Sequence, residues 1–507
     1  MRENRPYGSE GGEGDSPSRP LSSVEMDQRK MTAGILAFGA YIPRLRLQRR
    51  AIAEANAWFN PALNAQAKGE RAMCNWDEDA VTMAVEAARD ALAGRDRATI
   101  GSLQFASTSF PFADRLNAGI VTEALNLEKA VAALDVAASQ RAGTSVLMAA
   151  LRGGGETLVV AADKRRTRSA SPLEMSVGDG AAAILVGDGE AAARLLGAAS
   201  HTADFVDHYR GEDTAFDYQW EERWIRDAGY LKIVPPAIAQ CLQAAKVEPG
   251  NIAHFCMPAT LPRVAASVAK AAGIGDKAVR DNLHAVCGEA GAAHPLVMLV
   301  AALEQAKPGE RILVVGFGQG ADALLFETTD AVQHQPARRG VRGHLKRRKE
   351  ETSYAKYLSF NELVEVERGM RAEADKLTPL SSLWRNREML TGFLGGRCAT
   401  CGTLQFPRTA ICVNPNCNAV HAQEPHPFAE MTGRINSYTA DRLTYSPDPP
   451  ACYGMIQFDA GGRVMIDFTD VDAGELKVGQ PMRMMFRIKD VDPQRHFRRY
   501  FWKAAPQ

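Results

Sequence analysis

Hydrophobic positions between residues 31 and 330 alternate between continuous apolar runs and helical periods. In the segment 77–92, for example, Val81, Val85 and Leu92 fall on one helical face. Other runs are apolar throughout, which is typical of strands buried on both faces of a sheet. The pattern predicts strands at 35–42, 132–137, 157–162, 181–186, 252–255 and 311–315, and helices at 77–92, 142–151, 234–245 and 296–305.

The order of these elements indicates an α/β domain made of two similar halves. Apolar strands are separated by helices in both halves, and this alternation favours a sheet that helices cover on both faces. Because the two cycles follow a similar order, we expect an internal duplication.

Two polar segments divide the chain. Residues 1–30 contain twelve Gly, Pro and Ser without a hydrophobic period, which predicts disorder. Residues 338–349 contain seven Lys or Arg, and we interpret them as a solvated linker; the alternative is a surface for the phosphates of a nucleotide or of coenzyme A. The predicted organisation is a disordered tail (1–30), an α/β domain (31–330), a basic linker (331–352), a helical connector (353–392), a metal ribbon (393–425) and a small β-barrel (426–507).

The segment after residue 433 has the pattern of a small all-β domain. Short apolar runs recur at turn-like spacing, and Gly461-Gly462 between two of them is a hairpin signal. The predicted strands are 435–439, 453–458, 464–468, 482–488 and 499–502. Five short strands fit a barrel of the OB type.

Composition excludes several classes of function. The chain of 507 residues has 60 Lys and Arg against 60 Asp and Glu, so it lacks the basic surplus of a nucleic-acid-binding protein. No apolar run reaches the length of a transmembrane helix, and no apolar signal core follows the N-terminus. We therefore expect no nucleic-acid partner, no membrane association and a cytoplasmic location.

Four of the nine cysteines lie close together in sequence. Cys398 and Cys401 form a CxxC pair, and Cys412 and Cys417 follow within a short loop. Two such pairs can arrange four sulfurs tetrahedrally around zinc. Because four thiolates fill the coordination shell, the predicted zinc is structural and not catalytic.

The α/β domain (31–330), which we call the first block, resembles the branch of the thiolase superfamily that contains hydroxymethylglutaryl-CoA synthase and ketoacyl synthase III. The resemblance rests on segments 77–88 (DEDAVTMAVEAA), 142–144 (AGT), 177–183 (VGDGAAA) and 316–321 (GFGQGA), which occur in the family's order. It implies a thiolase-like fold, an acyl-CoA substrate with coenzyme A as part of it, and a homodimer or a heterodimer with a related protein.

The metal ribbon and the barrel (393–507), which we call the second block, resemble OB-fold proteins with a rubredoxin-like zinc ribbon that accompany thiolase-like enzymes. The match rests on the CxxCG segment 398–402, on 406–408 (FPR) and on 476–481 (LKVGQP). In relatives such a module is usually a separate partner that helps to accommodate the acyl-CoA, whereas here it is fused.

The residues at the family's catalytic positions differ from the family pattern. By this resemblance, Gln140 occupies the position of the family's cysteine nucleophile, and Cys256 occupies the position of its catalytic histidine. Glu289 replaces an asparagine of the family, and Thr108 lies near the position of its glutamate base. We predict Cys256 and Glu289 as proton-transfer groups, with Gln140 and Thr108 as polar positioners. His254 and His294 are the next candidates.

The glycine loop 316–320 is retained, and in the family its backbone N–H groups help to form an oxyanion hole. We therefore predict Gly316 and Gly318 as part of an oxyanion loop; a tight turn after a strand is the alternative.

These residues favour an acyl-CoA-processing enzyme that acts at a carbon–carbon bond by aldol, retro-aldol, Claisen, retro-Claisen or decarboxylation chemistry, without a cysteine nucleophile. Enolate chemistry needs an oxyanion hole, a base and a dry pocket. The alternative is a non-catalytic, CoA-binding scaffold subunit that partners an active thiolase-like synthase.

Overall fold

A computed structural model of the protein describes residues 33–377 and 379–507, so the tail predicted at residues 1–30 lies outside the described residues. The first block contains a nine-stranded sheet in the order β11-β12-β13-β8-β1-β7-β6-β4-β5. Its strands are β1 (Ala33–Tyr41), β4 (Ile100–Ala106), β5 (Ala132–Val136), β6 (Glu156–Asp163), β7 (Gly180–Asp188), β8 (Ala193–Thr202), β11 (His254–Cys256), β12 (Arg311–Phe317) and β13 (Gly320–Thr328).

This sheet consists of two halves joined by a short contact. Strands β1 and β8 share two residue pairs, Gly34 with Arg194 and Ile35 with Ala193. A Cβ at Gly34 would lie 2.6 Å from the backbone oxygen of Ala193, so only glycine allows this approach. The junction lets the chain form two sheet layers, as the predicted duplication requires.

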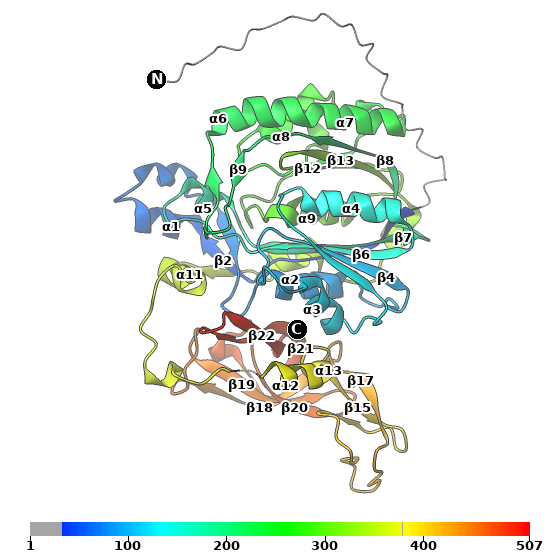
Figure 1. Ribbon diagram of the computed structural model, residues 1–507, viewed down its shortest axis with the longest axis vertical. Coiled ribbons are helices and arrows are strands. Elements are labelled where there is room, and N and C mark those ends of the chain that lie inside the picture. Colours follow the sequence, from blue (N-terminus) through cyan, green and yellow to red (C-terminus); the bar gives the residue numbers. More distant parts are fainter. Residues whose placement is uncertain (1–32, 378) are drawn as a thin grey trace, which may run out of the picture. The chain divides into compact units, whose positions relative to one another are not determined.

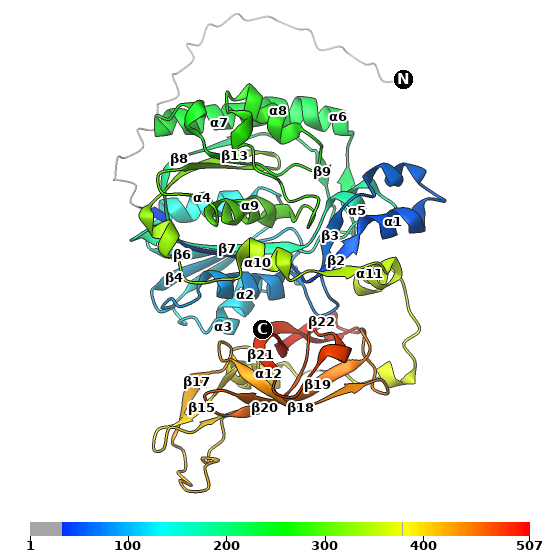
Figure 2. The same cartoon turned by 180° about the vertical axis from the view of Figure 1, so that it is seen from behind.

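Helices form three layers around the two halves of the sheet. Helices α4 (Ala142–Gly153) and α9 (His294–Leu303) lie between the halves and contact both (Figures 1 and 2). One outer face is covered by α7 (Leu231–Ala245) and α8 (Val264–Ala271), and the other by α2 (Ala80–Ala91) and α3 (Asn117–Ala124). The α/β prediction and the covered sheet are thus confirmed.

Helix α2 begins three residues later than the sequence pattern predicts. Asp79 caps the helix, because its side chain accepts a hydrogen bond from the backbone N–H of Thr82 while the Thr82 hydroxyl accepts from the N–H of Asp79. Asp77 and Glu78 therefore precede the helix, and their carboxylates contact other parts of the chain.

Strand β5 is an edge strand and not the buried strand that its apolar run predicts. It pairs only with β4, and the side chain of Leu134 is 40% exposed. An apolar run specifies a strand but cannot tell whether a second neighbour will cover it.

The basic segment differs from the solvated linker that the sequence predicts. It forms α10 (Gly340–Lys346) and β14 (Lys349–Glu351), and β14 pairs in parallel with β2 (Leu45–Gln48). Arg347 is largely buried and donates to Asp470 at 2.6 Å. Arg347 therefore neutralises a buried carboxylate of the barrel domain. The connector predicted to be helical (353–392) is helical only in part, since α11 covers Tyr354–Phe360 and two short helices follow at Leu380–Arg385 and Arg387–Leu390.

The second block contains a ribbon and a barrel. The ribbon sheet has the order β16-β15-β17 and the barrel sheet the order β20-β19-β18-β21-β22, which confirms the five predicted barrel strands. The strands are β15 (Leu394–Cys398), β16 (Leu404–Gln405), β17 (Gln423–Pro427), β18 (Gly433–Asp441), β19 (Ala451–Phe458), β20 (Arg463–Asp467), β21 (Pro481–Asp492) and β22 (Phe497–Pro506).

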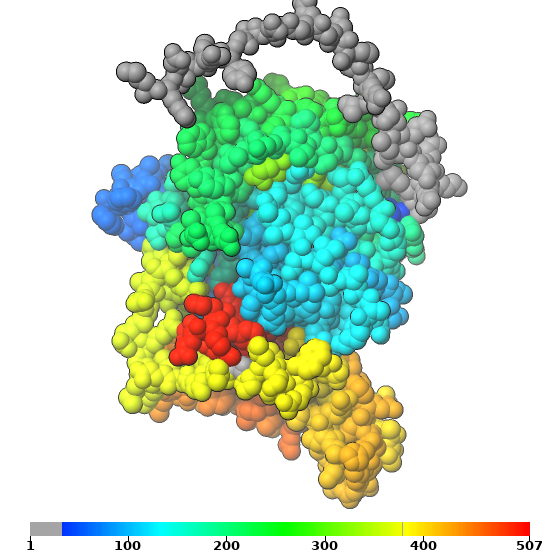
Figure 3. Space-filling model, in the orientation of Figure 1, coloured from blue at the N-terminus to red at the C-terminus, as the bar shows by residue number. Residues whose placement is uncertain are grey.

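One apolar core extends from α2 into the barrel. It contains Val81 and Val85 of the helix together with Phe486 and Trp502 of the barrel strands. Figure 3 shows residues of the C-terminal strand, in red, next to blue residues of the first block.

The remaining helices and strands are short. They are α1 (Arg49–Asn56), β3 (Glu70–Met73), α5 (Pro172–Ser176), β9 (His208–Tyr209), β10 (Tyr218–Gln219), α6 (Glu222–Trp224), a π-helix (Ile225–Tyr230), α12 (Leu380–Arg385) and α13 (Arg387–Leu390). In residues 33–377 and 379–507, every helix is too short or too polar to serve as a transmembrane span.

Candidate functional site

A narrow cavity of about 40 Å³ lies where the two halves of the first block meet. Its walls come from the start of α4, the loop before β9, the π-helix, the segment before α9 and the end of β12. The polar and aromatic side chains that line it include Gln140, Arg165, His208, Tyr230, Glu289 and Phe317. Two of the four predicted site residues outside the glycine loop, Gln140 and Glu289, are thus brought together.

The side chain of Gln140 is held by three donors. With the amide oriented to satisfy its hydrogen bonds, its oxygen accepts from the two terminal guanidinium nitrogens of Arg165 at 2.7 and 3.0 Å and from Nε2 of His208 at 3.0 Å. Gln140 lies directly before α4, where the helix dipole favours negative charge. The amide oxygen therefore occupies a position suited to a carbonyl that gains negative charge.

His208 is oriented by its neighbour Asp207. Its Nδ1 lies 2.8 Å from a carboxylate oxygen of Asp207, and the other Asp207 oxygen accepts from the Gln319 side chain at 3.2 Å. The contact with Asp207 fixes the orientation of the ring and leaves Nε2 beside the Gln140 amide at the cavity wall. His208 is thus a positioned imidazole in the site.

Arg165 is the central cation of the site. It is almost fully buried and pairs with Asp217, and it lies 3.5 Å from Glu289. Burial acts to lower its pKa, but Asp217 and Glu289 hold the pKa of Arg165 above its ordinary value. Burial likewise opposes ionisation of Asp217, yet Arg165 and then Arg210 keep the pKa of Asp217 below its ordinary value. Arg165 is therefore a fixed positive charge beside the cavity.

The backbone around Gly288 positions Glu289. Gly288 has φ of 77°, and a Cβ there would lie 2.6 Å from the carbonyl oxygen of Val177, so a glycine is needed. The N–H of Gly178 donates to the Glu289 carbonyl at 2.9 Å. These contacts direct the Glu289 side chain to the cavity wall.

The glycine loop lies against the start of α4. A Cβ at Gly318 would be 3.1 Å from the backbone nitrogen of Gln140, so the loop needs glycine for this approach. The N–H of Gly318 already donates to the carbonyl of Gly320 at 3.0 Å. Among the described residues, the N–H groups of Gln140 and Gln319 meet no acceptor. Of these residues Gln140 lines the cavity, so its N–H, and not the N–H of Gly318, is available there to an anionic oxygen.

Thr108 and Cys256 do not line the cavity. The hydroxyl of Thr108 donates to Asp163 at 3.1 Å, within a cluster in which Asp163 also accepts from Ser107 and Ser109. Cys256 is fully buried in the apolar core, and burial raises its thiol pKa to about 12. The geometry therefore gives Cys256 the environment of a core residue, in contrast to the proton-transfer role predicted for it.

The two reserve histidines are also satisfied elsewhere. His254 lies on β11 with Nε2 2.9 Å from a Glu310 oxygen. His294 begins α9, where its Nδ1 accepts from the N–H of Ala290 at 3.1 Å and its Nε2 lies 2.7 Å from the carbonyl of Asn282.

Sequence reasoning missed Arg165, Asp207 and His208. The signal that could have revealed the last two is their adjacency in a polar loop between two strands, because a carboxylate beside a histidine can orient its ring. Arg165 lies two residues after the end of the apolar strand β6, a position from which a charged side chain can enter a site at the end of the sheet.

The four clustered cysteines form the metal site of the ribbon. The four sulfurs all lie within 4.8 Å of one another, with Cys398–Cys417 at 3.9 Å and Cys401–Cys412 at 3.6 Å. A tetrahedral zinc with Zn–S bonds of about 2.3 Å places its sulfurs about 3.8 Å apart. The site therefore fits zinc, and the full set of four thiolates makes it structural.

Three domain families match parts of the chain. Residues 242–326 match the C-terminal domain of 3-oxoacyl-(acyl-carrier-protein) synthase III. Residues 392–420 match the rubredoxin-like zinc ribbon domain of ChsH2, and residues 427–487 match its C-terminal OB-fold domain. The zinc ribbon and the OB fold predicted from the sequence are thus confirmed.

Full-length relatives match the first block. The hydroxymethylglutaryl-CoA synthase of Aeropyrum pernix is 32% identical over 341 residues, which cover 65% of this chain and 94% of that protein. The enzyme of the same name from Pyrobaculum neutrophilum is 30% identical over 347 residues, covering 66% of this chain and 98% of that protein.

Solved structures share the fold at lower identity. A hydroxymethylglutaryl-CoA synthase crystallised with CoA is 20% identical, covers 68% of this chain and 94% of its own, and gives a TM-score of 0.56. Synthase III from Pseudomonas aeruginosa is 20% identical, covers 59% and 98%, and gives a TM-score of 0.52. The thiolase-like fold inferred from the sequence is confirmed.

Proposed function

The chain belongs to the hydroxymethylglutaryl-CoA synthase family, and from that membership we propose that it processes acyl-CoA thioesters at a carbon–carbon bond without a cysteine nucleophile. Relatives named for this reaction class, and a relative crystallised with CoA, support an acyl-CoA substrate. The observation that carries the proposal is the position of Gln140 in the cavity, with its amide oxygen facing Arg165 and His208.

An amide cannot attack a thioester, so covalent acyl transfer to residue 140 is not part of the mechanism. The remaining groups are suited to enolate chemistry. The free N–H group of Gln140 would hold the thioester oxygen and stabilise it as negative charge develops. Arg165 adds a fixed positive charge nearby.

Two cavity-lining groups, Glu289 and His208, are placed to move protons. In the cleavage direction, Glu289 accepts the proton of a β-hydroxyl group, and the bond between Cα and Cβ breaks to give a carbonyl product. The electron pair moves to the thioester as an enolate, and His208 returns a proton to Cα. Aldol addition is the reverse, and decarboxylation or Claisen-type chemistry passes through the same enolate. Cys256 is too deeply buried to take part.

The test is exchange of α-hydrogens. Purified protein is incubated in D₂O with a panel of CoA thioesters, and mass spectrometry measures deuterium at Cα, which reports enolisation whichever bond reaction follows. We expect exchange with at least one thioester and none with free acids. Binding of CoA thioesters with neither exchange nor turnover would instead support the non-catalytic scaffold.

We further propose that the protein acts as a homodimer, or pairs with a related synthase, through the edge of its sheet. Strand β5 leaves one edge unpaired within the described residues, and Leu134 on it is 40% exposed. Light scattering at micromolar concentration tests this, and a stable monomer would contradict it.

A further inference from the structure

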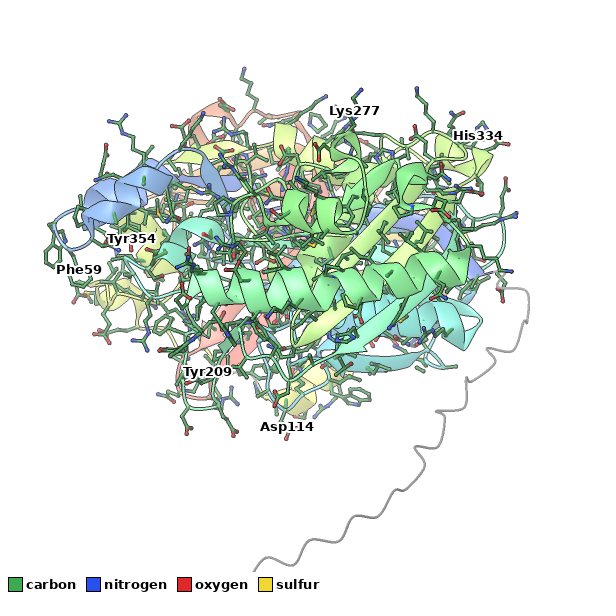
Figure 4. The ribbon with its side chains drawn as sticks, turned by 90° about the horizontal axis from the view of Figure 1, so that it is seen from above. Phe59, Asp114, Tyr209, Lys277, His334 and Tyr354 are labelled. Carbon is green, nitrogen blue, oxygen red and sulfur yellow. The ribbon has the colours of Figure 1, made fainter. Side chains whose placement is uncertain are left out.

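A second hollow, of about 230 Å³, opens beside the cavity. Its walls are mainly aromatic: Tyr209, Tyr218, Trp220 and Trp224, together with Val206. We call this hollow the aromatic groove. Figure 4 shows Tyr209 projecting outward at one edge of the view, opposite Lys277 and His334.

The aromatic groove exposes an unusual amount of apolar surface. The exposed fractions are 56% for Tyr209, 53% for Tyr218, 56% for Trp220 and 38% for Trp224. Single exposed aromatic residues are common, but several around one hollow mark a binding site.

The aromatic groove adjoins the cavity. Asp207 and His208 line both hollows. Beneath them, the ring of Trp224 stacks on Phe205 at 4.1 Å, and Phe205 lies 6.3 Å from Phe317, which lines the cavity. A group in the aromatic groove would therefore lie beside the imidazole that the reaction uses.

The hairpin that carries the aromatic residues is attached to the site by charge. Strands β9 and β10 pair Tyr209 with Tyr218, and Asp217 next to this pair binds both Arg165 and Arg210. These contacts preform the aromatic groove, so a ligand does not have to order it.

We propose that the aromatic groove binds the ring of an apolar, ring-bearing acyl group, with the thioester at His208; this rests on the proposed acyl-CoA chemistry. Flat aromatic walls favour stacking with a planar ring over contact with a short acyl chain. The adenine of CoA fits the aromatic groove poorly, because its neighbouring phosphates need cations, whereas the described lining residues include the acidic Asp207 and no Lys or Arg. The length of pantetheine also keeps adenine away from a thioester at His208.

The experiment measures calorimetric affinity of the full-length protein for phenylacetyl-CoA, acetyl-CoA and free CoA. We expect phenylacetyl-CoA to bind about tenfold more tightly than acetyl-CoA. In Trp220→Ala protein, the affinities for phenylacetyl-CoA and acetyl-CoA should differ by less than about threefold. Trp58→Ala is the matched control, because Trp58 is 85% exposed and does not line the aromatic groove, and it should leave the ratio unchanged.

Equal affinity for the two thioesters would overturn this inference and leave the proposed function intact. No binding of any CoA compound would overturn both. If light scattering shows that Trp220→Ala dissociates a dimer while the affinity ratio persists, the aromatic groove is an interface with a second copy and the inference is wrong.

Discussion

Nε2 of His208 lies 3.0 Å from the side-chain amide of Gln140, although the two residues are 68 positions apart in sequence. This contact joins the segment before α4 to the first residue of β9 and places the imidazole at the cavity wall. Because Asp207 orients the other ring nitrogen, the imidazole has one defined direction.

The first prediction follows from this contact. His208→Asn keeps the approximate shape of the side chain but removes the proton that the ring transfers. We expect α-hydrogen exchange and turnover to fall about a hundredfold or more. The matched control is His334→Asn on the exposed surface, which should keep the wild-type rate. Near-normal exchange by folded His208→Asn protein would exclude His208 as the acid.

The second prediction separates Cys256 from Glu289. Burial raises the pKa of the Cys256 thiol to about 12, so the thiol is neutral at pH 7 and inaccessible to reagents. Cys256→Ala should keep activity within about threefold, whereas Glu289→Gln should lose about a hundredfold or more. A large loss in folded Cys256→Ala protein, or iodoacetamide labelling of native Cys256, would contradict this assignment.

The third prediction concerns the ribbon. Cys412→Ser removes one of four zinc ligands, and we expect zinc content to fall from about one per chain to below about half. Because zinc binding supplies folding energy, protease should then cut the ribbon before the first block. Cys452→Ser is the control, because Cys452 lies outside the four-cysteine cluster. The Cys452→Ser protein should therefore keep its zinc. Elemental analysis that finds less than about half a zinc in wild-type protein would disprove the site.

The fourth prediction concerns the charges between α2 and the barrel. Lys503 donates to Asp77 at 2.8 Å, and both side chains are only 2% exposed. Lys503→Met leaves the buried carboxylate without this partner, so the free energy of unfolding should fall by about 3 kcal/mol. Arg50→Met is the matched control, because the Arg50–Glu54 pair is exposed and screened by solvent and should change the free energy of unfolding far less. Equal losses measured by urea unfolding would refute the importance of burial here.

The fifth prediction concerns pH and stability. Burial raises the pKa of Glu174 to about 7 from an ordinary 4.5, so between these values the folded protein binds this proton more tightly than the unfolded chain. The contribution of protonated Glu174 to the stability of the fold is complete below pH 4.5 and is lost as the pH rises toward 7. At pH 8 the free energy of unfolding of Glu174→Gln should therefore exceed that of the wild type by up to about 3 kcal/mol. At pH 4 the variant should have no such advantage over the wild type. Glu190→Gln, on the exposed surface, is the matched control. An equal response of the two variants to pH would contradict the assignment.

Much of the fold could be predicted from local patterns. Apolar runs and helical periods located β6, β7, β12, α4 and α9 to within a few residues, because each element must bury its own apolar positions. The error at β5 arose because an apolar run does not reveal whether another strand will cover it. The basic segment was misjudged for a similar reason, since the acidic partner of Arg347 is Asp470, 123 residues later.

The candidate site could be predicted only in part. Gln140, Glu289 and the glycine loop stood at positions that a family pattern marks in sequence. No sequence motif identified His208 and Arg165, because their place in the site depends on which distant residues face them. Cys256 occupied a marked position, yet its depth in the core decides its chemistry.

The sequence by itself determined those features whose cause is local: the zinc ligands by their spacing, the strands and helices by their hydrophobic periods, and the family by its ordered motifs. Tertiary structure alone decided which polar side chains line the cavity, the use of Asp77 and Glu78 as contacts to the barrel, and the aromatic groove beside the cavity. The physical reason is that a proton-transfer group, a buried ion pair or a binding surface is defined by the distance between side chains. Those distances are set when residues such as Asp77 and Lys503, 426 positions apart, are packed together.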